Sequence, residues 1–549
     1  MTAVQTKALP ANIRTWLGFV LMCLGMFMAI LDIQVVATSL PSIQNSLGIS
    51  PDTMSWIQTS YLIAEIVAIP LTGWLTQLLS MRWLFAASLV LFTLASLGCA
   101  ASGTFEMLVA FRVVQGFAGG TLIPAVFAAV FLLFPPRSQG IATTIAGVMA
   151  VLAPTLGPAV GGWITQTWSW HWLFLINIVP GLIVCIAGPP LLPRQPLNLG
   201  ALAEIDWRSL LLLATSLAAL EIGLKQAPQD GWASVTCGCL FAISAACGGL
   251  FVRGSLRAAH PIVQLDLFRH RSFAIGCALS FCLGVGLFGS VYLIPVFLAY
   301  VRGRDALQIG STLLVTGAAQ LAMSPVAVAL ERRLDARWLT AAGFIVFGIG
   351  LALSAFQTGD TDFDQMLVPQ IVRGIAIMFC LLPPTRLALG SLPEAQVPAA
   401  SGLFNLMRNL GGAVGIALID TILYGRSRVH ADALRMRLLS GDSKAAAAIG
   451  LDPSLLARSL SGPPLHAMEA LVRPMVEKTA FVWSVNEAWA MLAATAVLAV
   501  LLVPFAWRAS IGGTEKILAD DRTVSVKEDD YTGTKVTGEV IDEMVRLSS

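Results

Sequence analysis

The chain has 549 residues, of which 56% are hydrophobic and only 12% are charged, and its formal net charge is +2. Soluble domains carry about 25% charged residues, so this composition excludes an ordinary soluble protein and indicates a polytopic membrane protein. Because positive and negative charges nearly balance, their positions along the chain are more informative than their sum.

Apolar segments long enough to cross a bilayer, which takes roughly 20 residues each, follow one another along the sequence. We predict an all-α polytopic membrane protein with fourteen transmembrane helices, at about 16–39, 54–79, 83–101, 105–133, 140–165, 171–192, 207–226, 234–252, 273–300, 308–331, 338–356, 364–390, 398–424 and 481–507. The first run, Trp16 to Leu40, is too long for the apolar part of a secretory signal.

Basic residues are distributed unevenly among the loops. With the N-terminus in the cytoplasm, the short loops on the opposite side hold only Arg302 and Arg304, with Lys225 at a helix end. The basic residues of the other short loops then face the cytoplasm, which agrees with the positive-inside rule. The long segment 425–480 falls outside and is basic near its start, but long loops are poorly governed by this rule. An even number of helices returns the C-terminus to the same side. We therefore expect a multi-pass membrane protein with both termini cytoplasmic.

The segment 153–164 carries two prolines and three glycines inside a predicted membrane helix. Membrane helices tolerate these residues because neighbouring helices satisfy the freed backbone groups, and glycine lets another helix approach closely. The segment therefore predicts a bent, closely packed helix. Its hexamer Leu156–Gly161 returns 254 residues later as Leu410–Gly415.

Three further matches repeat at nearly the same offset: 81–87 with 336–342, 112–116 with 370–374, and Pro41, at the predicted end of the first helix, with Pro295. Two homologous halves of six helices have the same orientation, as in two-lobed secondary transporters whose substrate site lies between the lobes. The expected parts are an N-terminal six-helix lobe (1–192), two additional central helices with cytoplasmic linkers (193–272), a C-terminal six-helix lobe (273–507) and a flexible cytoplasmic tail (508–549).

The segment 425–480 interrupts the second lobe. Its amphipathic runs, Val429–Leu439 and Leu465–Val476, lie on either side of the Gly-Pro-Pro sequence at 462–464. We interpret it as an external helical hairpin, with a loose loop as the alternative.

Two carboxylic acids, Asp32 and Glu65, fall well inside predicted membrane helices. A charge at the bilayer centre costs about 2.5–3.5 kcal/mol on insertion scales, so such a residue normally faces a cavity or a partner. Arg112 is the cation expected to meet them, and Gln115 lies one turn further on the same face. We interpret Asp32, Glu65 and Arg112 as proton-coupling residues. The alternative is a protonated acid that makes one interhelical hydrogen bond.

Other polar residues in the predicted helices are candidates for substrate contact. Arg373 is the counterpart of Arg112 in the repeat, displaced by three residues, and Asn405 and Asn177 either bond neighbouring helices or contact substrate. The substrate-binding candidates are Gln34, Gln115, Asn405 and Arg373. Four charged residues carry no functional prediction: Arg408 and Asp420 are not assumed to pair, and Glu221 and Glu487 are expected near the membrane interfaces in structural roles.

No pattern indicates an enzyme, a cofactor, a metal centre or a nucleic-acid partner. The glycine-rich strings lack a Walker lysine, so ATP-driven transport is unsupported. The five histidines lie in loops or at helix ends, which excludes an imidazole proton relay and a nucleophile–histidine pair. Cys237 and Cys239 form a C-x-C in a predicted helix, which we interpret as packing rather than metal ligation.

Three motifs resemble the major facilitator superfamily, specifically its fourteen-helix drug:proton antiporters of the EmrB/QacA type, across 16–507. The stretch 31–41 is similar to the helix-1 motif LD-x-T-[IV]-V-N-x-A-LP, although Gln34 and Ala37 depart from it. The stretch 112–116 is similar to the helix-4 motif R-x-x-Q-G, whose arginine is implicated in proton coupling. The helix-5 antiporter motif G-P-x-x-G-G, associated with export, is matched by Gly157, Pro158, Gly161 and Gly162.

One family motif departs from its usual form. The helix 2–3 loop usually reads G-x-L-A-D-R-x-G-R-[RK], and here 73–82 carries Gln77 at the Asp position, Leu78 at the Arg position and Ser80 at the second Gly. The ionic contacts that the charged residues of this loop make in relatives, and the gating role of the loop, are therefore not expected in this protein.

The resemblance implies a proton-coupled antiporter that exports lipophilic or amphiphilic compounds by alternating access. Its partners would be small lipophilic substrates, protons and membrane lipid, and in the EmrB branch a periplasmic adaptor protein and an outer-membrane channel that dock at 425–480. We expect proton coupling in the first lobe, and packing as the role of the repeated 410–415. The alternatives are an exporter of one metabolite, such as a siderophore or an organic acid, and, more remotely, a non-transporting membrane sensor or scaffold.

Overall fold

The computed structural model describes residues 12–49, 51–194, 197–198, 200, 206–258, 261–331, 333–390, 392–451 and 466–505, and within these ranges every regular element is a helix. The chain divides into two units, 1–507 and 508–549, and the second lies outside the described residues. The α-helices are α1 (Ile13–Leu47), α2 (Pro51–Met54), α3 (Trp56–Ala100), α4 (Phe105–Leu133), α5 (Pro136–Thr167), α6 (Trp172–Leu175), α7 (Ile178–Leu191), α8 (Trp207–Asp230), α9 (Val235–Ser255), α10 (Arg271–Arg302), α11 (Ala306–Glu331), α12 (Ala336–Leu353), α13 (Phe363–Leu389), α14 (Val397–Leu439), α15 (Ser443–Ala448) and α17 (His466–Leu502). Short 3-10 turns are η2 (Leu265–Arg269), η3 (Ser354–Phe356), η4 (Glu394–Gln396) and η5 (Val503–Phe505).

The described helices account for the fourteen predicted membrane crossings. Twelve are long and apolar enough to span a bilayer, and α5 adds a thirteenth if its two bent halves form one span. Helix α3 has 45 residues and is interrupted by the non-helical backbone of Ser80 (φ 63°, ψ 159°). At 1.5 Å per residue it is about 68 Å long, more than twice the roughly 30 Å apolar core of a bilayer, so it contains two successive spans.

Three predicted helix ends are wrong. Helix α1 continues through Pro41 to Leu47, which is possible because membrane helices tolerate proline. Helix α14 runs on to Leu439 instead of ending at 424, and α17 begins at His466 instead of 481. Both extensions lie in the amphipathic runs of the predicted hairpin.

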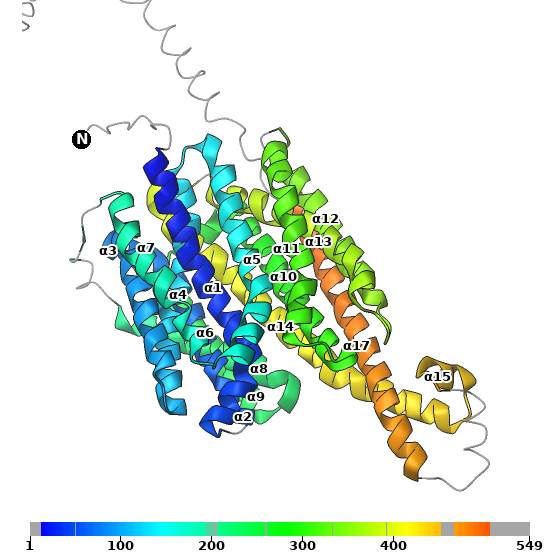
Figure 1. Ribbon diagram of the computed structural model, residues 1–549. Helices are drawn as coiled ribbons and strands as arrows, with labels where there is room; N and C mark the ends of the chain where they lie inside the picture. The colour runs from blue at the N-terminus through cyan, green and yellow to red at the C-terminus, as the bar shows by residue number, and fades with distance from the viewer. Residues whose placement is uncertain are drawn as a thin grey trace, which may run out of the picture. The chain divides into compact units, whose positions relative to one another are not determined.

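The helices form two six-helix lobes (Figure 1). Helices α1 and α3–α7 pack with one another, as do α10–α14 and α17. The two additional helices, α8 and α9, are joined by reciprocal bonds in which the hydroxyls of Ser216 and Ser244 each donate to the other residue's carbonyl at 2.9 Å. Helix α8 also packs against α3 and α14, one helix from each lobe. Helix α8 therefore lies at the seam between the lobes, with α9 packed on it.

Two close helix crossings join the lobes, α3 with α14 and α5 with α11. A Cβ added at Gly73 of α3 would lie 2.5 Å from the Cα of Ala399, and one at Gly310 of α11 would lie 2.6 Å from the Cβ of Ala159. Real Cβ atoms do not approach so closely, so glycine is required where the two lobes meet.

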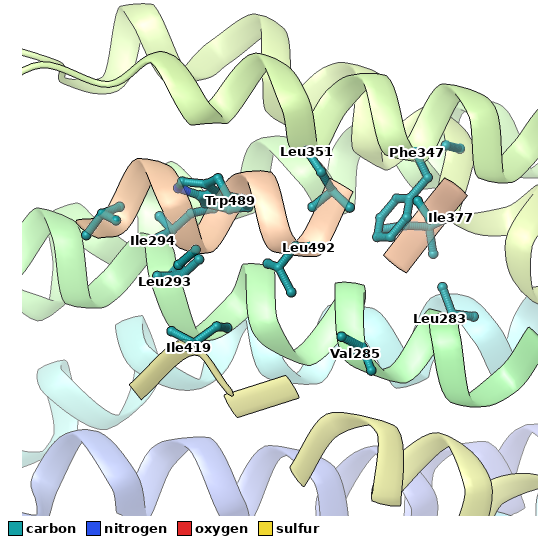
Figure 2. Close-up of a cluster of buried hydrophobic side chains, with 14 of the residues drawn as sticks. Leu283, Val285, Leu293, Ile294, Phe347, Leu351, Ile377, Ile419, Trp489 and Leu492 are labelled. Carbon is teal, nitrogen blue, oxygen red and sulfur yellow. The ribbon is translucent and has the colours of Figure 1, made fainter. Parts of the chain in front are cut away.

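The second lobe has a large apolar cluster (Figure 2). Trp489 and Leu492 of α17 are fully buried, and they pack with Leu293 and Ile294 of α10 and Leu351 of α12 in one cluster. The position at the centre of this lobe is thus filled by an indole ring and aliphatic side chains.

Beyond the membrane spans, α14 and α17 continue side by side and carry α15 near their far ends (Figure 1). A separate apolar cluster holds them together, formed mainly by Leu434 and Leu438 of α14, Ala445 of α15 and Ala480 of α17. These contacts explain the amphipathic pattern of the two runs. The Gly-Pro-Pro sequence at 462–464 lies outside the described residues.

Candidate functional site

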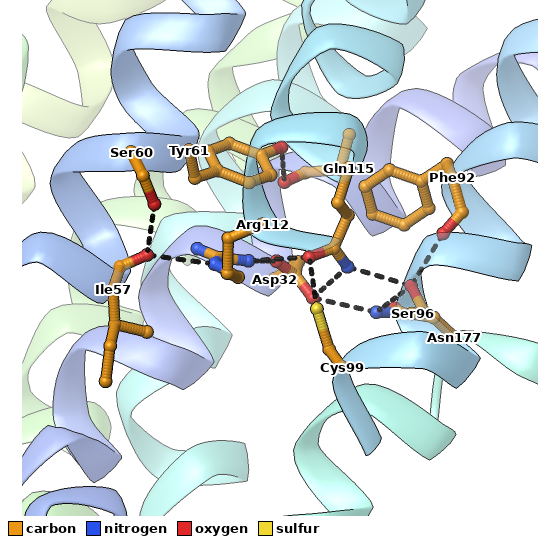
Figure 3. Close-up of polar contacts among 11 residues, drawn as sticks. Asp32, Ile57, Ser60, Tyr61, Phe92, Ser96, Cys99, Arg112, Gln115 and Asn177 are labelled. Atoms are coloured by element: carbon orange, nitrogen blue, oxygen red, sulfur yellow. Dashed lines mark hydrogen bonds and ion pairs between the residues drawn. The ribbon is translucent and has the colours of Figure 1, made fainter. Parts of the chain in front are cut away.

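The most polar cluster within the first lobe surrounds Asp32, whose side chain on α1 is fully buried. Its Oδ2 accepts a hydrogen bond from Nη1 of Arg112 at 2.5 Å. Its Oδ1 accepts from Nε2 of Gln115 at 3.0 Å and from Nδ2 of Asn177 at 2.9 Å (Figure 3). A buried charge is costly unless it is paired and hydrogen-bonded, and this carboxylate has both kinds of partner.

Three elements bring these donors together. Arg112 and Gln115 lie one turn apart on α4, and Nη1 of Arg112 also donates to Oε1 of Gln115 at 2.8 Å. Ser96, in the second span of α3, accepts from Nε2 of Gln115 at 2.8 Å. Asn177 stands at the break between α6 and α7, where the helix restarts and leaves its side chain directed at Asp32.

Arg112 is held from the first span of α3 as well. Its Nε donates to the carbonyl of Ile57 at 3.1 Å, and its guanidinium lies 4.3 Å from the ring centroid of Tyr61. Gly116 makes this approach possible, since a Cβ there would lie 2.3 Å from the Tyr61 carbonyl oxygen. The R-x-x-Q-G motif is therefore explained residue by residue: a cation, an amide and a glycine that lets α4 touch α3.

A cavity of about 190 Å³ lies between the lobes and is lined by α1, α3, α4, α5, α8, α10, α13 and α14. One water molecule needs only about 10–15 Å³ on this measure, so the space is large enough for an organic ligand. Most of the lining is aliphatic or aromatic. The charged and amide side chains among the lining residues are Gln34, Gln58, Glu65, Glu221, Arg408 and Asn409.

The three residues predicted to couple protons occupy two places. Asp32 and Arg112 form the buried ion pair, whereas Glu65 lines the cavity with 5% of its surface exposed. No hydrogen bond or ion pair within 4 Å joins Arg112 to Glu65 in the described part of the chain. The expectation that Arg112 meets both acids is therefore met directly only for Asp32.

The substrate-binding candidates are also divided. Gln34 lines the cavity, while Gln115 belongs to the buried ion-pair network. Asn405 is buried behind the lining, where its Nδ2 donates to the Ser401 carbonyl at 2.8 Å and its Oδ1 accepts from Arg408.

Arg373, the fourth candidate, lies beside the apolar cluster of the second lobe, with its guanidinium 4.8 Å from the ring centroid of Trp489. By the offset of 258, Gln370 corresponds to Arg112 and Arg373 to Gln115. By the offset of 254, Gly286 corresponds to Asp32, and a Cβ at Gly286 would lie 2.5 Å from a ring carbon of Phe347. Among the described residues, the second lobe thus has an arginine without the matching acid, and the buried ion pair lies in the first lobe.

Glu221 is the acid in the cavity wall that the sequence did not single out. It was expected near a membrane interface, but α8 places it in the cavity wall. Lys225, one turn further, donates to Ser55 at 2.9 Å and to Thr59 at 2.5 Å, which fastens α8 to the start of α3. The sequence contained a sign of this position, because Glu221 lies fifteen residues into the 24-residue helix α8, well away from its start.

Glu487, expected near an interface in a structural role, accepts hydrogen bonds from Arg426 and His430 where the hairpin leaves the bundle. Asp420 accepts from Tyr292 at 2.7 Å, so it does not pair with Arg408. Within the residues that the structure describes, no group of three or more histidine, cysteine or acidic side chains is arranged to hold a metal ion.

Helix α5 is bent by 41° between Pro136–Pro154 and Leu156–Thr167, as its prolines and glycines predict. Gly157 of the antiporter motif packs on α1, where a Cβ would lie 2.3 Å from the Cβ of Gln34. Pro158, Gly161 and Gly162 are buried, and the Gly161 carbonyl accepts from Thr165 at 2.7 Å.

The repeated segment on α14 does more than pack. A Cβ at Gly411 would lie 2.1 Å from the Phe281 carbonyl oxygen of α10, which is close helix packing, but Gly412 and Ala413 line the cavity. The segment therefore packs closely, as expected, and also forms part of the cavity wall.

Two six-helix lobes around a shared apolar cavity, with a buried ion pair in one lobe, define a secondary membrane transporter. The family model described as Major Facilitator Superfamily matches residues 22–418, and the chain belongs to this superfamily. The chain is 39% identical over 424 residues to the colistin resistance protein EmrB of Acinetobacter baumannii, covering 77% of this chain and 82% of the relative.

It is also 31% identical over 412 residues to the multidrug export protein EmrB of Escherichia coli strain K12, covering 74% of this chain and 80% of the relative. Among solved structures, the proton:xylose symporter XylE aligns with a TM-score of 0.55 at 13% identity, covering 89% of this chain and 95% of the symporter. At that identity the likeness concerns the fold alone.

Proposed function

We propose that this protein is a proton-coupled efflux transporter that exports lipophilic or amphiphilic compounds by alternating access. The observation that carries the proposal is the ion pair of Asp32 and Arg112, fully buried in the lobe wall beside a cavity shared by both lobes. The names of the relatives, a colistin resistance protein and a multidrug export protein, support the same class of substrate.

Helix α1 connects the proposed proton-binding residue with the wall of the substrate cavity. It carries Asp32 toward α4 and carries Ile30, Ile33 and Gln34 into the cavity wall. A proton on Asp32 cancels its charge and removes the partner of Arg112. Two unit charges about 4 Å apart at an effective dielectric constant near 20 interact by about 4 kcal/mol, or close to a thousandfold in an equilibrium between two lobe orientations.

In the proposed cycle Asp32, with Glu65 as a second acid facing the cavity, takes a proton from outside and releases it to the cytoplasm while substrate moves outward. One elementary charge moved through 100 mV is worth about 2.3 kcal/mol, or nearly fiftyfold in accumulation. The aliphatic lining suits a lipophilic body, and Gln34 supplies a polar contact in the cavity wall.

We further propose the topology and partners expected from the sequence. Both termini lie in the cytoplasm of a bacterial inner membrane, and the hairpin of α14, α15 and α17 projects on the periplasmic side, where an adaptor protein joined to an outer-membrane channel docks on it. Support comes from the positive-inside pattern and from the apolar cluster that makes this hairpin a compact element. The division into 1–192, 193–272, 273–507 and 508–549 is part of the same proposal.

The test is substrate efflux driven by a pH gradient in proteoliposomes. Asp32→Asn should abolish it while leaving the protein folded and in the membrane, because the amide cannot carry the proton. Glu106→Gln, which removes an exposed acid at the start of α4, is the matched control and should transport normally. Full efflux by Asp32→Asn would place the proton elsewhere and make Glu65→Gln the next variant.

A further inference from the structure

Two acids line the cavity, from neighbouring helices of different origin. Glu65 lies in the first span of α3, within the first lobe, and Glu221 lies on α8, one of the two additional helices. Glu65 is 5% exposed and faces the cavity without any hydrogen bond or ion pair in the described part of the chain. The Oε2 atom of Glu221 is buried and also has no hydrogen-bond partner there.

The nearby basic residues are occupied elsewhere. Lys225 is directed at Ser55 and Thr59 of α3 rather than into the cavity. Arg408 belongs to α14, where it donates to Asn405 and lies 5.2 Å from the ring centroid of Phe127. Arg112 is engaged by Asp32. Among the described residues, no basic side chain therefore makes an ion pair with either acid, although buried charges are normally paired.

We propose that Glu65 and Glu221 together bind the positively charged group of a lipophilic cation, whose apolar body occupies the rest of the cavity. This inference rests on the proposed export function and adds to it the charge class of the substrate. Residues such as Leu62, Ile66 and Phe288 supply the apolar surface around the site. Helix α8, one of the two additional helices, is thus part of the binding site, since it provides one of the two acids.

The experiment measures equilibrium binding of two probes of nearly the same shape and opposite charge, tetraphenylphosphonium and tetraphenylborate, to the purified full-length protein in detergent. The wild type should bind the cation at least tenfold more tightly than the anion. Glu221→Gln should weaken binding of the cation at least tenfold, equivalent to about 1.4 kcal/mol, and leave the anion unchanged or tighter. Glu65→Gln should do the same, and Glu221→Asp should keep much of the preference.

The double variant Glu65→Gln/Glu221→Gln leaves Arg408 as the charged side chain among the described lining residues. Its preference should therefore reverse toward tetraphenylborate. Glu106→Gln, an exposed acid on α4, is the control and should bind both probes as the wild type does. The melting temperature of each variant, taken in the same detergent, checks that it is folded.

The proposal is overturned if the wild type shows no preference for the cation, or if Glu221→Gln behaves like Glu106→Gln. It is also overturned if Glu221→Gln weakens both probes equally, because that result indicates a structural role. Binding in detergent needs no proton gradient, so the proposed export function can fail in proteoliposomes while this site stands. Conversely, if proton-driven efflux is observed but the protein binds both probes equally well, the cation site is refuted and the export function stands.

Discussion

The ion pair of Asp32 and Arg112 leads to a prediction about folding stability. Both side chains are fully buried, with Nη1 of Arg112 2.5 Å from Oδ2 of Asp32. Replacing Arg112 with methionine leaves the carboxylate with two amide donors and no cation. Breaking a buried pair in this way typically costs about 3–5 kcal/mol, and the Coulomb energy at about 4 Å and an effective dielectric constant near 20 is about 4 kcal/mol.

We therefore expect Arg112→Met to lower the free energy of unfolding by about 3–5 kcal/mol at pH 7. The double variant Asp32→Asn/Arg112→Met removes both charges and should be distinctly more stable than Arg112→Met. The measurement is reversible unfolding in mixed micelles, followed by circular dichroism, for the wild type, both single variants and the double variant.

Arg373→Met is the matched control in the second lobe. Arg373 is buried against Trp489 and makes no hydrogen bond or ion pair among the described residues, so its removal should cost less than about 1 kcal/mol or stabilise the protein. If the effects of Asp32→Asn and Arg112→Met add to within about 0.5 kcal/mol, the two groups are not coupled and the reasoning is refuted.

Three further outcomes follow from the fold. Gly157→Val should abolish efflux with the protein still inserted, because even a Cβ would stand 2.3 Å from that of Gln34; normal transport would contradict the close packing. Ser80→Gly should raise the free energy of unfolding by about 1–3 kcal/mol, since its φ of 63° and ψ of 159° lie in a region that essentially only glycine occupies; a loss of stability would refute the strain. A hydrogen bond from Arg304 lowers the pKa of Asp362 to about 2, below the value near 3.9 expected in the unfolded chain. The stabilisation from Asp362 is therefore complete above about pH 4 and lost as the pH falls toward 2, so Asp362→Asn should melt below the wild type at pH 7 by a gap that narrows under pH 4. A gap independent of pH would show that the charge is not responsible.

Several features were predictable from the order of residues alone. Long apolar runs specify membrane helices because each must satisfy its backbone in lipid, and the repeat at offsets of 254 to 258 specifies two similar lobes. Asp32 and Arg112 were recognisable because a charge inside such a run is costly without a partner. The glycines and prolines of α5 indicated its bend and its close contacts for the same reason.

At Ser80 the sequence and the tertiary structure explain each other. The sequence shows serine where the family motif has glycine, and the backbone at Ser80 has a positive φ that favours glycine. The motif glycine is thus explained by the turn between the two spans of α3, which no count of apolar residues reveals.

Tertiary packing decided which side chains meet. Asn177 lies 145 residues from Asp32 in the chain, yet it completes the bonding of that carboxylate. Glu221 lies in the transport cavity because α8 packs between α3 and α14 at the seam of the lobes. In a soluble helix, the alternation of polar and apolar residues marks the buried face, but lipid is as apolar as a protein core. The faces of these helices therefore look alike in sequence, and the partner of each polar residue is set by how the bundle assembles.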